Sequence, residues 1–207
     1  MTARPAGGTA KGTPLRRLGR LAGGARILPR PPSPSPEAAV AEARRWLGYL
    51  EHRDGRLLGV YAANWGKGGH TVFAPMAGLP QGLPWCVTFV HAVCRAAWGP
   101  ERAEEALGRP HPGSRKLARR MRRTGRWRGR EYRPSPGDLI FLSPAGDGRV
   151  GHCGLVEAVE GNAVISIDGN TVDPEGRFPP EAGGAVARRA RPLADPRIVG
   201  YGALGAG

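Results

Sequence analysis

Cysteine, acidic residues and long apolar runs are all scarce in this chain of 207 residues. There are three cysteines, an odd number, and Cys86 and Cys94 lie eight positions apart in a segment with a helical pattern. That separation is about 12 Å of helix rise, too long for a disulfide bond, and nothing in the sequence calls for a bridge between Cys94 and Cys153. We therefore predict no disulfide framework, which leaves the thiols available for chemistry. No stretch approaches the roughly 18 apolar residues that a membrane-spanning helix needs.

The shortage of acidic residues leaves the chain strongly basic. Its 31 Lys and Arg residues against 17 Asp and Glu give a formal net charge of +14. A charge of this size favours polyanionic partners such as nucleic acid, teichoic acid or an anionic membrane surface. A composition that is rich in arginine without any selected binding site has the same charge, and both interpretations stay open.

The first 35 residues have the composition of a disordered tail. No acidic side chain occurs in residues 1–36, glycine and proline are frequent, and residues 29–36 form a low-complexity run. Such a segment cannot bury enough apolar surface to offset its ordering entropy. We therefore predict a disordered basic tail over residues 1–35 and one folded domain over residues 36–207, large enough to bury about 70% of its unfolded surface.

The apolar pattern changes along the folded part. Helical patterns, the first with Ser35 as its expected N-cap, occupy residues 36–50, 85–94, 100–107 and 114–124. Between residues 66 and 84, two ordered loops are expected on either side of a short extended piece. Strand patterns separated by turn signals then occupy residues 138–142, 152–159, 163–168, 185–190 and 198–201. Helices followed by antiparallel strands predict an α+β fold.

Cys86 follows Pro84 and Trp85 at the start of the buried helix predicted over residues 85–94. Unpaired backbone N–H groups and the helix dipole stabilise a thiolate at such a position, and the same N–H groups suit an oxyanion. A buried structural cysteine would occupy the same place. Position alone therefore does not decide the role of Cys86.

His152 opens a predicted strand directly after a glycine-rich turn, where a substrate has room to approach. Farther along, Asp168 and Asn170 lie two positions apart in the next strand segment, so their side chains are predicted to share a face. One or both would hold the imidazole of His152 in the tautomer that a general base requires. Each residue taken singly also fits a satisfied polar side chain or a turn residue.

Four motifs occur in order along the folded part. They are PWCVTFV at residues 84–90, PGDLIF at 136–141, GHCGLV at 151–156 and IDGNT at 167–171. Together they resemble the CHAP domain, the cysteine, histidine-dependent amidohydrolase/peptidase module of phage lysins and bacterial wall hydrolases. With further similar segments at residues 46–51, 64–66 and 198–202, the resemblance covers nearly all of residues 40–204.

The resemblance implies a papain-like α+β fold, with N-terminal helices packed on a C-terminal antiparallel β-sheet. It also implies that Cys86 is the nucleophile and His152 the base. Asp168 stands where the family usually has Glu, and Asn170 matches the family's Asn. Because the side chain of Asp168 is shorter than Glu, the question of which of the two orients His152 is left open.

Two residues near Cys86 are weaker candidates. Many members of the family carry a Gln directly before the nucleophile that completes the oxyanion hole, and this chain has Trp85 there. Gln81 is the nearest substitute for that Gln, and Trp85 is a candidate substrate-binding residue.

The same resemblance implies that the substrate is peptidoglycan. The reaction would be hydrolysis of an amide bond, by an N-acetylmuramoyl-L-alanine amidase or by a peptide endopeptidase. No cofactor is implied, and because no Asp-rich loop is present no metal is expected, although some members of the family bind calcium. A monomer that acts on the cell wall is expected. No clear signal peptide is recognised, because the pair Arg16 and Arg17 precedes a segment broken by Arg and Gly.

A zinc-binding module is one competing interpretation, since cysteine and histidine side chains are potential ligands. It fits the spacing poorly. Cys86 and His91 lie about 140° apart around a helix, and the neighbours His152 and Cys153 point to opposite sides of a strand.

The stronger competitor is a polyanion- or nucleic-acid-binding protein in which the CHAP-like fold is catalytically inactive. Ten Lys and Arg side chains lie within residues 115–133, with Trp127 and Tyr132 interleaved. For a wall hydrolase, the same segment would dock the protein to anionic wall polymers. A solvated face of an arginine-rich protein has the same pattern.

Overall fold

The computed structural model of the protein describes residues 35–53, 56–57, 70–176 and 183–205. The tail predicted over residues 1–35 lies outside these residues except for Ser35, and so does the glycine-rich loop at residues 66–69. No helix in the described ranges is long and apolar enough to cross a membrane.

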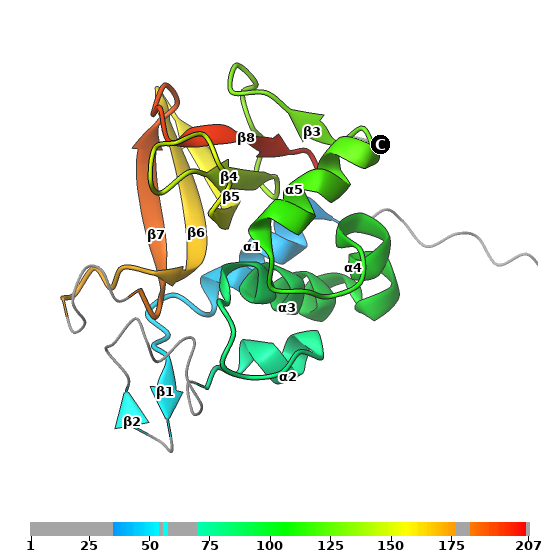
Figure 1. The fold of residues 1–207 in the computed structure, drawn as a ribbon, viewed down its shortest axis with the longest axis vertical. Helices are drawn as coiled ribbons and strands as arrows, with labels where there is room; N and C mark the ends of the chain where they lie inside the picture. Colours follow the sequence, from blue (N-terminus) through cyan, green and yellow to red (C-terminus); the bar gives the residue numbers. More distant parts are fainter. Residues whose placement is uncertain (1–34, 54–55, 58–69, 177–182, 206–207) are drawn as a thin grey trace, which may run out of the picture. The chain divides into compact units, whose positions relative to one another are not determined.

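Along the described chain most helices come first and the long strands follow (Figure 1). The helices are α1 (Pro36–Arg44), α2 (Phe73–Ala77), α3 (Cys86–Trp98), α4 (Pro100–Leu107) and α5 (Ser114–Arg123). Two short strands that pair with each other, β1 (His52–Arg53) and β2 (Arg56–Leu57), lie between α1 and α2 in the chain. The other strands are β3 (Trp127–Arg128), β4 (Leu139–Leu142), β5 (His152–Glu160), β6 (Ala163–Thr171), β7 (Ala185–Pro192) and β8 (Ile198–Gly202).

The later strands form one antiparallel sheet in the order β3-β8-β4-β5-β6-β7. In the view of Figure 1 the long strands β5, β6 and β7 stand above α2 and α3. Buried apolar side chains of β4, β5, β6 and β7 share one hydrophobic core with the helices. The predicted α+β arrangement of N-terminal helices on a C-terminal antiparallel sheet is thereby confirmed.

The helix α3 supports the site and is deeply buried. Every residue from Cys86 to Cys94 is buried, as its all-round apolar pattern predicts for a core helix. The helix contacts α1, α2 and α4 and also the strands β5 and β6. Its approach to β6 is close because Gly169 has no side chain, and a Cβ at that position would collide with Phe89. This packing holds the first turn of α3 beside the strands that carry the other site residues.

The prediction of an extended piece between residues 66 and 84 is wrong for residues 73–77, which form α2. The Thr71 hydroxyl accepts a hydrogen bond of 3.3 Å from the backbone N–H of Ala74 and so caps this short helix. Pro75 lies in the first turn, where a missing N–H costs little, and Gly78 ends the helix with a φ of 70°. A helix this short has too few turns for its periodicity to be recognised in a sequence.

The first helix is also shorter than its apolar stripe predicts. α1 ends at Arg44, and residues 45–48 form turns. Leu50 then forms an antiparallel bridge with Ala185, the first residue of β7, and the two side chains are buried together. Leu50 therefore has the spacing of a helical residue in the sequence, but in the structure it pairs with the first residue of β7.

Candidate active site

Cys86 and His152 are brought together by the first turn of α3 and the first residue of β5. Cys86 is the first helical residue after the N-cap Trp85 and is only 5% exposed. His152 pairs with Leu142 at the end of β4, and its imidazole is partly exposed. Both residues line one pocket with a volume of about 510 Å³. The candidate nucleophile and the candidate base therefore face the same cavity.

The pKa values of these two side chains are shifted in opposite directions. Burial by itself would raise the pKa of the Cys86 thiol, but the hydrogen bond with His152 and the charge of its ring bring that pKa below its usual value. Burial likewise opposes the charged form of His152, but hydrogen bonds with Asp168 and Cys86 raise its pKa to about 10. Both shifts favour the charged forms of the two side chains, a thiolate on Cys86 and an imidazolium on His152.

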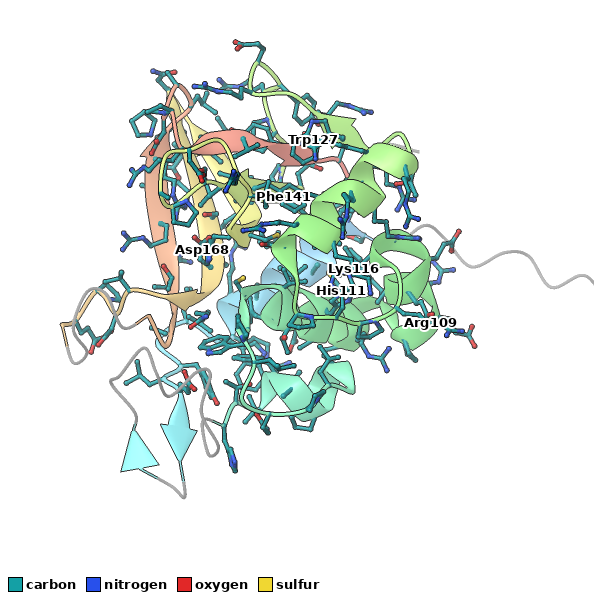
Figure 2. All side chains as sticks on the ribbon, viewed as in Figure 1. Arg109, His111, Lys116, Trp127, Phe141 and Asp168 are labelled. Atoms are coloured by element: carbon teal, nitrogen blue, oxygen red, sulfur yellow. The ribbon has the colours of Figure 1, made fainter. Side chains whose placement is uncertain are left out.

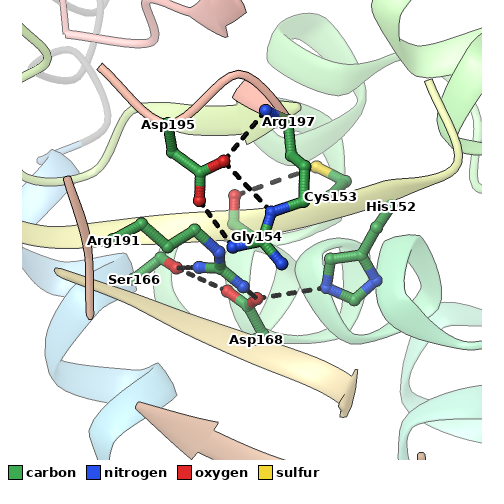
Figure 3. Close-up of polar contacts among 8 residues, drawn as sticks. All are labelled: His152, Cys153, Gly154, Ser166, Asp168, Arg191, Asp195 and Arg197. Atoms are coloured by element: carbon green, nitrogen blue, oxygen red, sulfur yellow. Dashed lines mark hydrogen bonds and ion pairs between the residues drawn. The ribbon is translucent and has the colours of Figure 1, made fainter. Parts of the chain in front are cut away.

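Asp168, on β6, is fully buried behind His152 (Figure 3). Its Oδ2 lies 3.2 Å from Nε2 of His152. When Nε2–H donates to this carboxylate, Nδ1 is the ring nitrogen left to interact with Cys86. This is the geometry that an orienting carboxylate requires, and it also stabilises the imidazolium.

Arg191 and Ser166 hold the Asp168 carboxylate in its charged form (Figure 3). The Ser166 hydroxyl donates to Oδ1 at 2.6 Å, and the Arg191 guanidinium donates to Oδ2 at 2.7 Å and to Ser166 Oγ at 2.8 Å. Burial opposes the charge on Asp168, but the hydrogen bond of His152, the charges of Arg191 and His152 and the hydrogen bond of Ser166 bring its pKa well below the usual range. The sequence analysis missed both Arg191 and Ser166.

A glycine makes room for this carboxylate. Gly154 lies on β5 next to β6, and a Cβ at that position would collide with Asp168. The second glycine of the GHCGLV motif is therefore required by the buried acid on the next strand, because any side chain there would displace the group that contacts His152.

Asn170 lies in the pocket but makes different contacts. The pairing of β6 with β7 shifts between Asp168 and Thr171, and Asn170 has a positive φ of 55°. Its Oδ1 accepts a hydrogen bond of 3.3 Å from the backbone N–H of Gly184. The regular alternation that placed Asp168 and Asn170 on one face is interrupted at this point, and the carboxylate of Asp168 is the group that contacts the ring of His152.

The two weaker candidates lie away from this pocket. Trp85 is 2% exposed, stacks on Phe73 and donates its indole N–H to Glu51 at 3.1 Å. The Gln81 amide accepts from the backbone N–H of Thr71 at 2.9 Å and donates to its carbonyl at 2.8 Å. Among the described residues, neither Trp85 nor Gln81 lines the cavity that Cys86 and His152 share. The substrate-binding and oxyanion roles predicted for them gain no support, because the ring is used in core packing and the amide in closing a loop.

Arginine side chains dominate the charged lining of the cavity. Arg115 comes from α5, Arg189 and Arg191 from β7, and Arg197 from the turn before β8. Arg191 is paired with Asp168, and Arg197 is paired with Asp195 at 2.7 Å. Arg115 and Arg189 form no ion pair with any carboxylate of the described residues, so they leave the cavity with a positive wall.

The other two cysteines have a different character. Cys94 and Cys153 are fully buried, and burial raises the pKa of each thiol well above its usual value. No group of three or more His, Cys, Asp or Glu side chains that would hold a metal ion occurs in the described part of the chain.

A cysteine at a helix start and a histidine thus face one cavity, and a buried carboxylate lies behind the histidine. The family model of the CHAP domain matches residues 78–170 of this chain, slightly less than half of its length. The matched segment contains Cys86, His152, Asp168 and Asn170, and the resemblance that the four motifs predicted is confirmed.

Solved structures give a weaker match. The crystal structure of Ly7917 is 15% identical to this chain, with a TM-score of 0.47, over 81% of this chain and 61% of that one. The structure titled "The crystal structure of Ly7917 with the hydrolyzing product of MDP" is also 15% identical, with a TM-score of 0.46, over 83% and 63% of the two chains. This chain thus spans less than two thirds of the length of those proteins. No curated protein is significantly similar to it.

Proposed function

We propose that this protein is a peptidoglycan hydrolase that cleaves an amide bond, with Cys86 as the nucleophile, His152 as the general acid and base, and Asp168 as the orienting group. The observation that carries the proposal is the chain of contacts from Cys86 through His152 to the buried Asp168 at a cavity of about 510 Å³. A thiol whose pKa is lowered beside a charged imidazole is the activated form of a cysteine nucleophile.

In the first half of the reaction, the Cys86 thiolate attacks the carbonyl carbon of the substrate amide. The backbone N–H groups in the first turn of α3 point toward the developing oxyanion and stabilise it. As the C–N bond breaks, the imidazolium of His152 gives its proton to the departing amine. The acyl group remains on Cys86 as a thioester.

In the second half, His152 is neutral and takes a proton from water as the water attacks the thioester. The C–S bond breaks, the acyl group leaves as a carboxylic acid, and the thiolate–imidazolium pair is restored. Asp168 holds the ring of His152 in one orientation throughout and stabilises it whenever it is charged.

Peptidoglycan is proposed as the substrate because the chain matches the CHAP family and because the cavity wall is positive. The stem peptides of peptidoglycan carry free carboxylates, and Arg115 and Arg189 offer them guanidinium groups that no carboxylate of the described residues occupies. The muramoyl–L-alanine bond and the bonds within the stem or crossbridge peptide are all amides. The same chemistry therefore serves an amidase or an endopeptidase.

The test is the mass of the fragments that the purified protein releases from purified sacculi. Intact stem peptides with a free L-alanine amino group would identify an amidase, and muropeptides cut within the peptide would identify an endopeptidase. The Cys86→Ala variant, with its fold checked by circular dichroism, should release neither. If it releases fragments as fast as the unaltered protein, or if the unaltered protein releases none, the proposal is wrong.

A further inference from the structure

A second hollow lies directly beside the catalytic cavity. It has a volume of about 340 Å³, and its charged lining consists of Arg115, Arg119 and Arg122 from α5 and Arg149 from the loop between β4 and β5. The two hollows share Arg115 and Val150 in their lining, and the Arg115 side chain donates a hydrogen bond of 3.2 Å to the carbonyl of Val150. We call this second hollow the α5 groove.

Three of the four arginines of the α5 groove occupy one face of α5, which is a short amphipathic helix. Residues 115, 119 and 122 recur at intervals of four and three, while Leu117 and Met121 are buried in the core. Like charges at this spacing repel each other by a few tenths of a kcal/mol per pair, so the arrangement does not serve helix stability. Asp147 is the carboxylate that pairs with a groove arginine, at 3.8 Å from Arg149, and both side chains are largely exposed. The groove is therefore strongly positive.

The aromatic residues interleaved in this basic segment are used inside the protein. Arg122 lies over the ring of Trp127 at 3.9 Å, and Phe141 packs against the same ring with centroids 5.3 Å apart (Figure 2). Tyr132 donates its hydroxyl to Asp138 at 3.1 Å and packs against Tyr201. Proteins that bind single-stranded nucleic acids stack bases on open aromatic rings. Trp127 and Tyr132 are engaged in these internal contacts, and the lining of the α5 groove offers no aromatic ring on which a base would stack.

We propose that the α5 groove binds a polymer of phosphodiester-linked polyols, an anionic polymer of the kind attached to bacterial walls. Guanidinium groups pair with phosphate oxygens through two parallel hydrogen bonds, and a row of four suits a chain of repeated phosphates. Because the groove adjoins the catalytic cavity, the bound polymer keeps Cys86 close to the wall to which that polymer is attached. The binding site deepens the proposed function, but binding itself does not depend on catalysis.

The test compares two double variants that remove the same charge from different surfaces. Arg119→Ala/Arg149→Ala removes two groove arginines, whereas Lys116→Ala/Arg123→Ala removes two cations of α5 that lie outside the groove. The probe is poly(glycerol phosphate), and its dissociation constant is measured by fluorescence anisotropy at several salt concentrations. We expect the groove variant to bind at least tenfold more weakly, with a smaller salt slope, and the control variant to change less than threefold.

A single-stranded oligonucleotide with the same number of phosphates is the second probe. The unaltered protein should bind it no more tightly than poly(glycerol phosphate), because the groove offers bases no stacking surface. If both double variants bind equally weakly, the polymer is attracted by the general positive charge of the surface and not by a defined site, and the proposal is overturned. Tighter binding of the oligonucleotide would overturn it in favour of nucleic acid.

Hydrolysis provides a separate readout. Both double variants should cleave a small soluble peptide substrate as fast as the unaltered protein, while the groove variant alone should digest polymer-bearing sacculi more slowly. On sacculi stripped of the polymer, the two double variants should digest at the same rate. A rate difference that persists there would show that the groove variant is not slowed by the loss of polymer binding. If the protein hydrolyses nothing but binds as described, the catalytic proposal fails and the polymer site stands.

Discussion

Two places along α3 each combine a buried cysteine with a histidine and differ in charge: the first has Cys86 with His152 of β5, and the second has Cys94 and His91 of the helix itself. At the start of the helix, the pKa of Cys86 is lowered and that of His152 is raised to about 10. In its interior, burial raises the pKa of Cys94, while burial and the positive charges nearby lower that of His91 to about 3. One region therefore favours an ion pair, and the other favours neutral side chains.

The difference in charge comes from the groups that surround each histidine. Burial opposes charge in both regions, but the first contains the carboxylate of Asp168, which Arg191 and Ser166 hold in place. The charged neighbours of His91 are His111, Arg95 and Lys116, all of which disfavour a second positive charge. The pKa of the buried Cys86 thiol is lowered because His152 beside it is held in its charged form, and the buried acid behind that histidine raises the histidine's pKa.

The largest expected effect comes from removing that acid. Asp168→Ala should lower the catalytic rate by roughly 10² to 10⁴, because His152 loses both its orientation and the charge that stabilises its imidazolium. The alkaline limb of the pH–rate profile, set by the pKa of about 10 of His152, should also move to lower pH. Rates followed from pH 4 to 10 measure both changes. Asn170→Ala should cost less, and the reverse order would identify Asn170 as the orienting group.

The next largest effect should separate the three thiols. At pH 7, iodoacetamide should alkylate Cys86 about a hundredfold faster than Cys94 or Cys153, because the thiolate is the reactive form and burial keeps the other two protonated. Peptide mass mapping after timed quenching measures the three rates. Cys94→Ala and Cys153→Ala should keep their activity. Equal alkylation of all three thiols would show that His152 does not activate Cys86.

A smaller effect is expected at the arginine behind the acid. Arg191→Gln should lower kcat about tenfold and also lower the melting temperature, since it removes a buried charge partner of Asp168. Arg191→Lys should restore part of the lost kcat and part of the lost melting temperature. The matched variant Arg189→Gln, two residues earlier on the same strand, should raise KM for acidic peptides while leaving kcat unchanged. Loss of kcat in Arg189→Gln but not in Arg191→Gln would contradict this division of roles.

The smallest effect concerns stability in acid. The folded-state pKa values of His91 and His111, about 3 and about 4, lie below the usual value, so the unfolded chain binds more protons below about pH 6.5. Each histidine should then cost about 1.4 kcal/mol of stability per pH unit as the pH falls from 6.5 toward those values. In His91→Leu, the stability lost between pH 7 and pH 5 should shrink by about 2 kcal/mol. Urea unfolding at the two pH values measures it, and an unchanged loss would show that His91 does not titrate on unfolding.

Much of this site was visible in the sequence, for reasons that are local. The glycine turn before His152 and the apolar run after Cys86 are signals within single elements, so the strand β5 and the helix α3 were predicted within a few residues of their ends. The five-residue helix α2 was missed because it carries too little periodicity. The roles predicted for Trp85 and Gln81 gained no support, because closeness to Cys86 in the chain did not bring either side chain into the lining of the cavity.

Arg191 shows why the rest of the site could not be predicted without the three-dimensional structure. It lies 23 residues from Asp168 in a chain with many arginines, and nothing in its own strand distinguishes it from an exposed cation. The pairing of β6 with β7 brings it to the carboxylate. For Asn170, the sequence predicted a side chain on the same face as that of Asp168. A shift in the same strand pairing and a positive φ interrupt the alternation on which that prediction depended.

The sequence by itself determined the resemblance to the CHAP domain, the α+β order of elements and the choice of Cys86 and His152 as candidate site residues, because these follow from short patterns along the chain. Only the tertiary structure decided that Asp168 contacts His152, that Arg191 keeps this acid charged and that four arginines border a groove beside the cavity. The physical reason is that charge acts through space. The pKa of a buried group depends on which side chains the sheet and helices bring within a few ångströms, whatever their distance along the chain.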